Sequence, residues 1–482
     1  MSREFDVAVI GSGIGGLTCG ALLARQGMRV AVLEQQPRIG GCAQDFSRKS
    51  HTFDSSVHSV SMADSGFVCG LLTQLGIRES LEIVPNTCFA RILSPVLRYS
   101  LAADVSSLTA SLGRDFPGEK EAVAALLSDM QLLFNSYKGS LRDGAVFSGT
   151  MGSAGEIERA TRSYKEYIES FVKDDALRYL FSSVWPFGGS SPAFAPVYNA
   201  FIFIAHALEG SHYIKGGFGK LASALAGVIT KCGGAVMTNW QVTGLGVDGH
   251  KRVCAVRSAT GEELAAPMFV SNVSPYRLHC EFIPEGSRNR LWLRRLGNLS
   301  PSVSAVCAYL GIRGDASDIV ADNVTFWFAS PDHDALYRRI RQGPRGDIDH
   351  LLIMRPPAAR PDSTITLMHF VNQDPAASWK KEKRRLADAM IAKAAAVLGD
   401  FTSRISLVET ASPDTFERYT GNTGGALYGF ENAPDLYRQS KLPFTTYLDN
   451  LFQVGHWTKA GGGIYNVMTS GHAVAKMILR MS

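Results

Sequence analysis

A glycine pattern near the start of the chain has the residue types and spacing to support chemistry. Gly11, Gly13 and Gly16 follow a short apolar run and open a stretch of helix-forming residues. In such a pattern the first glycine makes a tight turn, the second lets the backbone approach a pyrophosphate, and the third lets the helix pack on the strand. Glu34 ends the next apolar run and can accept hydrogen bonds from a ribose. The pattern predicts a dinucleotide site, whose ligand would supply the redox chemistry.

The composition narrows the possible classes of protein. A chain of 482 residues exceeds one ordinary core, so we expect roughly two or three domains. Its net charge of +5 is small and scattered, which argues against a nucleic-acid partner. The 8 cysteines form no CxxC pair, so neither a metal site nor a redox dithiol is expected. They are typical of the reduced cysteines of a cytoplasmic protein.

Two features bear on membranes. The first strand is expected from about residue 5, which leaves no room for a signal peptide, and no stretch has the roughly 18–20 apolar residues of a span. We therefore expect no integral membrane protein. Residues 195–208 come nearest to a span, and at that length they indicate a buried core helix or an interfacial segment. The run 198–208 within them suits either a core helix or the wall of a lipophilic tunnel. Residues 288–296 place four arginines around Leu291 and Trp292, which suits either docking to anionic lipid or a solvated amphipathic helix.

The order of the expected elements indicates interleaved domains. Apolar spacing predicts mainly helices between residues 90 and 210, including 120–134, 154–168 and 174–183. A helix that stops at a glycine pair then leads into short β-like runs separated by turn signals, which predicts a small antiparallel insertion. Strands, a charged helix and a final strand, glycine turn and helix complete the chain. The expected elements are residues 220–232, 235–238, 242–247, 252–258, 263–271, 302–310, 364–371, 379–398 and 450–481.

Four blocks of residues resemble a known family. They are the segment 8–34 with Gly40-Gly41-Cys42, Phe53-Asp54-Ser55-Ser56-Val57-His58, the segment from Lys215-Gly216-Gly217 to Val270-Ser271-Asn272, and Tyr428-Gly429 with the segment 455–471. Together they are similar to the flavin-dependent carotenoid desaturases, carotenoid isomerases and retinol saturases, within the amine-oxidase-like flavoproteins. Cys42 after the glycine pair favours the polyene branch, because amine-oxidase relatives usually place arginine there.

The resemblance implies an α/β fold and identifies the dinucleotide as FAD. The expected architecture is a Rossmann-type (GR2-like) FAD-binding domain with a β-insertion, joined to an inserted α+β substrate domain. The FAD-binding domain would consist of residues 1–90, 211–290 and 416–482, and the substrate domain of residues 91–210 and 291–415. The residues implied in cofactor binding are Gly11, Ser12, Gly13, Ile14, Gly15, Gly16, Glu34, Gln35, Gly41, Cys42, Ser56, Val242, Gly455, His456, Gly463 and Ile464.

Several residues near the expected flavin have two readings. His58 suits proton transfer or substrate positioning, or is a satisfied histidine of the cleft. Tyr465 either faces the flavin or packs, and Cys42 reads as a packing residue rather than a covalent flavin link. His456 stands where the family commonly has an acid, so we expect the flavin end to be built differently.

The sequence thus predicts an FAD-dependent oxidoreductase acting on a long, apolar polyene or isoprenoid molecule. Saturation, desaturation and cis–trans isomerisation all remain open, because the hydride chemistry belongs to the cofactor. One alternative is an amine oxidase with a polar substrate. The other is a flavin-free prenyl-binding protein, which the complete pattern from Gly11 to Glu34 disfavours. The partner expected is a lipophilic small molecule, with peripheral membrane contact as an option.

Overall fold

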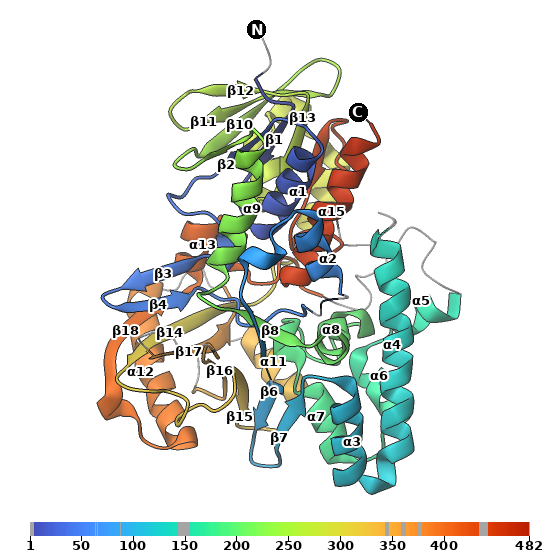
Figure 1. Ribbon diagram of the computed structural model, residues 1–482, viewed down its shortest axis with the longest axis vertical. Helices are drawn as coiled ribbons and strands as arrows, with labels where there is room; N and C mark the ends of the chain where they lie inside the picture. The colour runs from blue at the N-terminus through green and yellow to red at the C-terminus, as the bar shows by residue number, and fades with distance from the viewer. Residues whose placement is uncertain are drawn as a thin grey trace.

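A computed structural model describes residues 4–62, 64, 66–86, 88–142, 154–342, 347–357, 363–373, 378–432 and 442–481. Within these ranges the chain forms two principal sheets with helices around them (Figure 1). The first sheet is parallel, in the order β19-β13-β1-β2-β9. Its strands are β1 (Val7–Ile10), β2 (Val30–Leu33), β9 (Ala235–Met237), β13 (Met268–Ser271) and β19 (Leu451–Gln453). Segments far apart in the sequence are therefore neighbours in this sheet.

The two faces of the parallel sheet have different covers because side chains alternate along a strand. Val7 and Val9 belong to the core beneath helices α1 (Ile14–Arg25), α9 (Gly219–Lys231) and α15 (Ile464–Leu479), with α1 packed against the other two. Ala8 and Ile10 face the opposite way. They pack against the antiparallel insertion of β10 (Val242–Val247), β11 (Val253–Ser258) and β12 (Glu263–Ala265). This arrangement is the predicted Rossmann-type unit with its β-insertion.

The second sheet has the order β18-β14-β17-β16-β15-β6-β7 among the described residues. Its strands are β6 (Cys88–Leu93), β7 (Arg98–Ala102), β14 (Ser304–Ile312), β15 (Val324–Phe328), β16 (His350–Met354), β17 (Ser363–Val371) and β18 (Ile405–Ala411). All pairs are antiparallel except β15 with β6. The segment after residue 90 therefore begins in this sheet, and the helices expected there start later. The division into domains at the predicted boundaries stays a prediction, and the boundary at residue 90 falls inside β6.

Helices fill the space beside the second sheet (Figure 1). They are α3 (Val105–Asp115), α4 (Lys120–Arg142), α5 (Ala154–Thr161), α6 (Tyr164–Phe171), α7 (Asp175–Ser182), α8 (Phe201–Glu209) and α11 (His333–Gln342), with α12 (Trp379–Leu398) on the far side of the sheet. The single helix expected over residues 154–168 is two helices, because Ser163 Oγ accepts the N–H of Glu166 and starts a new helix. The strand expected over 263–271 is likewise two strands, β12 and β13, separated at Pro267.

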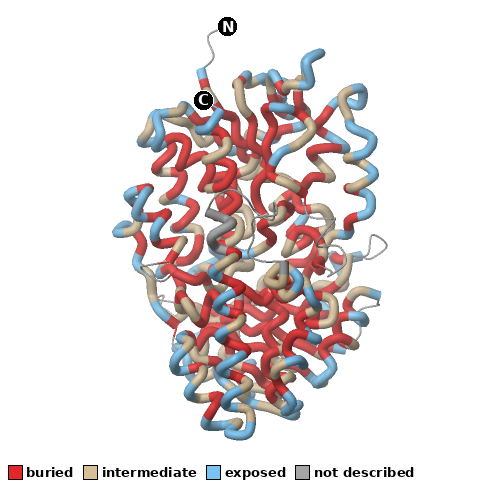
Figure 2. Tube along the Cα trace, turned by 90° about the vertical axis from the view of Figure 1, so that its right-hand side faces the viewer, coloured by how far each residue is buried: buried red, intermediate tan, exposed pale blue. Residues whose placement is uncertain are grey.

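Smaller elements connect these layers. They are the hairpin β3 (Asp45–Arg48) and β4 (His51–Asp54), the pair β5 (Ile83–Asn86) and β8 (Ser211–Ile214), and helices α2 (Phe67–Gln74), α10 (Arg290–Gly297) and α13 (Pro413–Thr420). Buried backbone runs through both halves of the molecule, with exposed segments at the periphery (Figure 2). Among the described helices, we find none with the length and apolar character needed to cross a bilayer.

Candidate functional site

The glycine turn has the geometry that a phosphate-binding loop requires. Gly11 has φ +92°, in the region that favours glycine. A Cβ on Gly16 would lie 2.6 Å from the carbonyl oxygen of Gly11, so only glycine lets α1 start this close to β1. A Cβ on Gly13 would collide with the side-chain amide of Asn272, which follows β13. Asn272 was not among the predicted site residues, although it closes the Ser271-Asn272 pair that carried part of the resemblance.

Glu34 holds the turn from the end of β2. Its Oε2 accepts the backbone N–H of Ser12 at 2.9 Å and the Ser12 hydroxyl at 2.5 Å. Its Oε1 accepts the N–H of Gln36 at 2.8 Å. The carboxylate is buried, with 7% of the residue exposed, yet it lines the same cavity as Gln35. Glu34 is thus a buried acceptor beside the glycine turn, and its predicted contact with a ribose stays a prediction.

A second glycine turn lies against the first. Gly455, Gly461 and Gly463 have φ values of +91°, +79° and +93°, and they lead from β19 into α15. A Cβ on Gly471 would lie 2.5 Å from the Gly15 carbonyl oxygen, so α15 crosses α1 at close range. No side chain in the described part of the chain caps the N-terminus of either helix. Two helix N-termini therefore present N–H groups and positive dipole ends at one place.

One cavity brings the predicted site residues together. Its lining includes both glycine turns, the Gly41-Cys42 segment, Ser56 and Val242. Of the predicted cofactor residues, Gly16 alone is absent from the lining, because it packs against the strand instead. His58 and Tyr465 line the cavity as well.

The groups in this cavity fit FAD. N–H donors at two uncapped helix starts match the acceptor oxygens of a pyrophosphate, and buried Glu34 matches ribose hydroxyls. Gly13 and Gly41 approach so closely that a Cβ on Gly41 would lie 3.3 Å from the Gly13 Cα. This close approach leaves backbone rather than side chains along the wall. Assignment of the individual cofactor contacts stays a prediction.

His456 belongs to a polar network at the second glycine turn. Asn422 Oδ1 accepts the indole N–H of Trp457 at 2.9 Å and the Nε2–H of His456 at 3.1 Å. The Asn422 amide also donates to Cys42 Sγ at 3.6 Å. Burial lowers the pKa of His456 to about 4, so the ring is neutral at pH 7. His456 is therefore an uncharged group where the family commonly has an acid. Asn422 gave no signal in the sequence, because it is distant from its three partners along the chain.

Cys42 and His58 are also uncharged at neutral pH. Burial raises the pKa of the Cys42 thiol to about 11, which suits packing better than nucleophilic chemistry. Burial lowers the pKa of His58 to about 4. The Nδ1–H of His58 donates to the Ser56 carbonyl at 3.3 Å, which leaves Nε2 as a lone-pair acceptor. The ring of His58 lies 5.6 Å from that of Phe187.

The remainder of the cavity wall is largely aromatic. Tyr465 packs between Phe67, at 5.4 Å, and Phe134, at 6.2 Å between ring centroids. The segment 198–208 is buried and helical, as one of its two interpretations predicted, and Tyr198, Phe201 and Ala205 also line the cavity. Its role as the wall of a lipophilic tunnel stays a prediction. The apolar lining includes Phe134, Tyr137, Phe187, Tyr198, Phe201, Ala205, Met368, Leu427, Tyr428, Ala460 and Tyr465. The sequence pointed to few of these, since they come from helices, loops and the second sheet.

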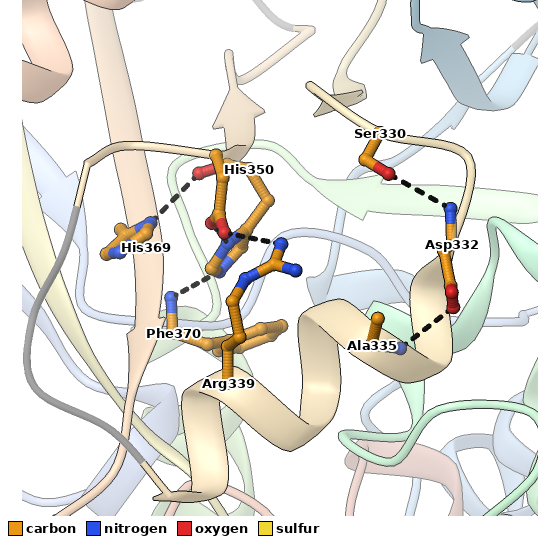
Figure 3. Close-up of polar contacts among 8 residues, drawn as sticks. Ser330, Asp332, Ala335, Arg339, His350, His369 and Phe370 are labelled. Atoms are coloured by element: carbon orange, nitrogen blue, oxygen red, sulfur yellow. Dashed lines mark hydrogen bonds and ion pairs between the residues drawn. The ribbon is translucent and has the colours of Figure 1, made fainter.

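A separate polar cluster lies at the second sheet (Figure 3), and its residues Asp349, His350 and His369 do not belong to the lining of the cavity. His350 Nδ1–H donates to Asp349 at 2.8 Å, and its Nε2 accepts the N–H of Phe370 at 2.9 Å. Asp349 also pairs with Arg339 at 2.9 Å, and His369 Nδ1–H donates to the His350 carbonyl at 3.0 Å. Asp349, His350 and His369 lie close enough to share a metal ion. Both ring nitrogens of His350 are already bonded, so the cluster is satisfied as a hydrogen-bond network.

The fold and the cavity define a dinucleotide-binding redox enzyme. The model of the flavin-containing amine oxidoreductase family matches residues 14–479. The chain belongs to this family, and it is an FAD-dependent oxidoreductase.

Individual relatives show which members of the family this chain resembles. The human all-trans-retinol 13,14-reductase is 23% identical over 486 residues, which cover 89% of this chain and 78% of the relative. The neurosporene-forming phytoene desaturase of Rhodobacter capsulatus is 26% identical over 500 residues, which cover 98% of this chain and 93% of the relative. These relatives confirm the predicted resemblance to the polyene-converting group. An oxidoreductase structure from Methanosarcina mazei has a TM-score of 0.66 and 16% identity over 99% of this chain and all of that one, which shows the shared fold.

Proposed function

We propose that this enzyme adds hydrogen to, removes it from, or isomerises a carbon–carbon double bond of a long, apolar, conjugated molecule. The observation that carries the proposal is the continuity of one cavity. It runs from the glycine turns to a wall of aromatic and aliphatic side chains on α4, α8 and the second sheet. The names of the relatives, a retinol reductase and a phytoene desaturase, support the same class of substrate.

The apolar wall would orient the substrate and exclude water. FAD, when bound, supplies a group that accepts or donates a hydride. Phe134 and Tyr137 on α4 and Phe201 and Ala205 on α8 offer flat, apolar surfaces to an extended π system. Such surfaces bind by removing apolar area from water. Among the lining residues that the structure describes, Glu34 alone carries a carboxylate, and it is bonded to Ser12 and Gln36, so the apolar wall holds no acid to pair with a charged amine. This chemistry favours a polyene over the polar amine of the alternative reading.

We propose that His58 handles the proton that accompanies the hydride. Conversion of a C–C bond to C=C removes one hydride and one proton from adjacent carbons, and saturation returns both. His58 is neutral, its Nδ1–H is held by the Ser56 carbonyl, and its Nε2 is left able to take up a proton. Replacement by phenylalanine is expected to slow turnover while the flavin content stays normal. Unchanged turnover would show that His58 only lines the cavity and takes no part in proton transfer.

Contact with a membrane surface would give the enzyme access to such a substrate, because an apolar molecule partitions into lipid. Helix α10 exposes Leu291, with 77% of the residue accessible, between Arg290 and Arg294. This charge and apolar pattern matches an anionic lipid surface. Flotation with vesicles that contain phosphatidylserine, compared between the wild type and Leu291→Asp, tests this part of the proposal.

The test of the function is a substrate panel with the FAD-loaded protein. Anaerobic mixing with polyenes, retinoids and amines should change the flavin absorbance with a polyene or retinoid and leave it unchanged with amines. The flavin-reduced enzyme should be mixed with the same panel to cover saturation. Product analysis then distinguishes saturation, desaturation and isomerisation. Reduction of the flavin by an amine alone would overturn the proposal.

A further inference from the structure

Three polar side chains form a cluster in the apolar wall of the cavity. Ser59 and Ser61 flank Val60, whose backbone pairs with His212 through two hydrogen bonds of 3.0 and 2.9 Å. Side chains alternate along extended backbone, so both serines point away from Val60, which packs in the core. Both serines reach His206 on α8: Ser59 Oγ lies 3.2 Å from Nε2 and Ser61 Oγ 3.2 Å from Nδ1. All three residues line the cavity.

The protons of this cluster leave one hydroxyl able to donate. A neutral imidazole has one N–H and one lone pair. One serine must donate its proton to the lone pair, while the other accepts the N–H and keeps its own O–H for another partner. One O–H of the two serines therefore remains unused in either tautomer of His206. The cluster therefore offers a hydroxyl donor to the cavity whichever nitrogen carries the proton.

The surroundings make this donor selective. The ring of Phe187 stacks on His206 with centroids 5.4 Å apart, and Phe89 lies 6.1 Å away. Ser61 and His206 are buried, with 2% and 5% of each residue exposed. A hydroxyl in such an apolar setting is costly to cover with hydrocarbon, because it would lose its hydrogen bond with water. A ligand with an oxygen atom at this point satisfies it.

We propose that Ser59, Ser61 and His206 bind the terminal oxygen of the substrate, a hydroxyl or a carbonyl group on one end of a polyene chain. This inference rests on the proposed function and adds a substrate class to it. Ser59 and Ser61 lie on the same segment as His58, so an oxygen bound there would fix the position of the substrate chain relative to His58.

Binding of matched ligands to the FAD-loaded protein tests the proposal. All-trans-retinol, all-trans-retinal and the hydrocarbon with the same conjugated chain are titrated while quenching of tryptophan fluorescence is followed. We expect the wild type to bind the two oxygenated ligands about tenfold or more tightly than the hydrocarbon. Substitution of the serines alone would leave the N–H of neutral His206 as a donor. The variant Ser59→Ala/Ser61→Ala/His206→Leu removes every donor of the cluster, so it should lose this preference and keep the affinity for the hydrocarbon.

Ser183→Ala is the matched control. Ser183 lies 3.0 Å from His333 Nε2, so the variant also removes a buried serine–histidine hydrogen bond, but outside the cavity lining. It should keep the preference for oxygenated ligands. Equal loss of affinity for all three ligands in the triple variant, retention of the preference by that variant, or a wild type that shows no preference, would overturn the end-group site. Failure of every ligand to bind the wild type would instead overturn the proposed function.

Discussion

Asn422 fixes the proton of His456. The side-chain oxygen of Asn422 is identified by the Trp457 indole N–H that it accepts at 2.9 Å, and an oxygen can only accept from His456 Nε2 at 3.1 Å. His456 therefore carries its proton on Nε2, and the Cδ2 side of its ring faces Gly429. Nδ1 is left as the acceptor. A neutral acceptor thus stands beside the second glycine turn, where a carboxylate would add a negative charge.

Asn422→Asp should raise the pKa of His456 from about 4. A carboxylate at hydrogen-bond distance favours the imidazolium, typically by about 1–3 pKa units. The titration can be followed by NMR of labelled histidine and by the pH dependence of the flavin absorbance. Asn422→Leu is the neutral control, in which burial alone keeps the pKa low. Identical titration of the two variants would contradict the role assigned to Asn422.

Gly13→Val should abolish FAD binding. The branched side chain would occupy the space of the Asn272 amide and of the approaching pyrophosphate. The expected result is a colourless protein whose flavin content, measured by absorbance after denaturation, is close to zero. Gly227→Ala is the matched control, because Gly227 lies within α9 and a Cβ there meets no atom within 4 Å. Retention of flavin by Gly13→Val would refute the phosphate assignment.

The features that the sequence predicted are those that depend on residue spacing within a short segment. The turn from Gly11 to Gly16, the partner Glu34 and the β-insertion follow from spacing within short segments, and the structure shows each of them. The second sheet was not predicted as a unit, because β6 joins β15 across more than 200 residues and only their pairing shows it. For the same reason Asn422 was missed, and Asn272, although it belongs to a segment that carried the resemblance, was not assigned to the site. Their partners are brought close by tertiary packing, and a single asparagine has no periodic signature.

Acidification below pH 6.5 should lower the stability of the fold. His333 Nδ1 accepts the indole N–H of Trp185 at 3.2 Å, and its Nε2–H donates to Ser183, whose hydroxyl proton goes to the Tyr179 carbonyl. Burial lowers the pKa of His333 to about 3, so the unfolded chain binds more protons between pH 6.5 and about 3. The free energy of unfolding then falls as the pH decreases through that window, by about 1.4 kcal/mol per pH unit for each such imidazole.

Urea denaturation at pH 7 and at pH 5 checks this dependence. His333→Phe should be less stable than the wild type at pH 7, because it leaves the Trp185 N–H and the Ser183 hydroxyl oxygen without their partner. Its stability should nevertheless decrease less between pH 7 and pH 5, since one proton-binding site of the unfolded chain is gone. An equal decrease in both proteins would show that His333 is not among the groups responsible.

Ala205→Phe should separate substrate binding from flavin binding. Ala205 on α8 lines the apolar part of the cavity and is 3% exposed, so a phenyl group placed there would fill space that an extended chain needs. We expect the Kd for a long polyene to rise by about tenfold or more, while FAD content and the Kd for a short polyene change little. Ala205→Val should give a smaller effect of the same sign, because it fills less of the space. If Ala205→Phe instead loses FAD in proportion to polyene affinity, the apolar wall and the dinucleotide site are one unit. An unchanged Kd for the long polyene would place the substrate elsewhere than along α8.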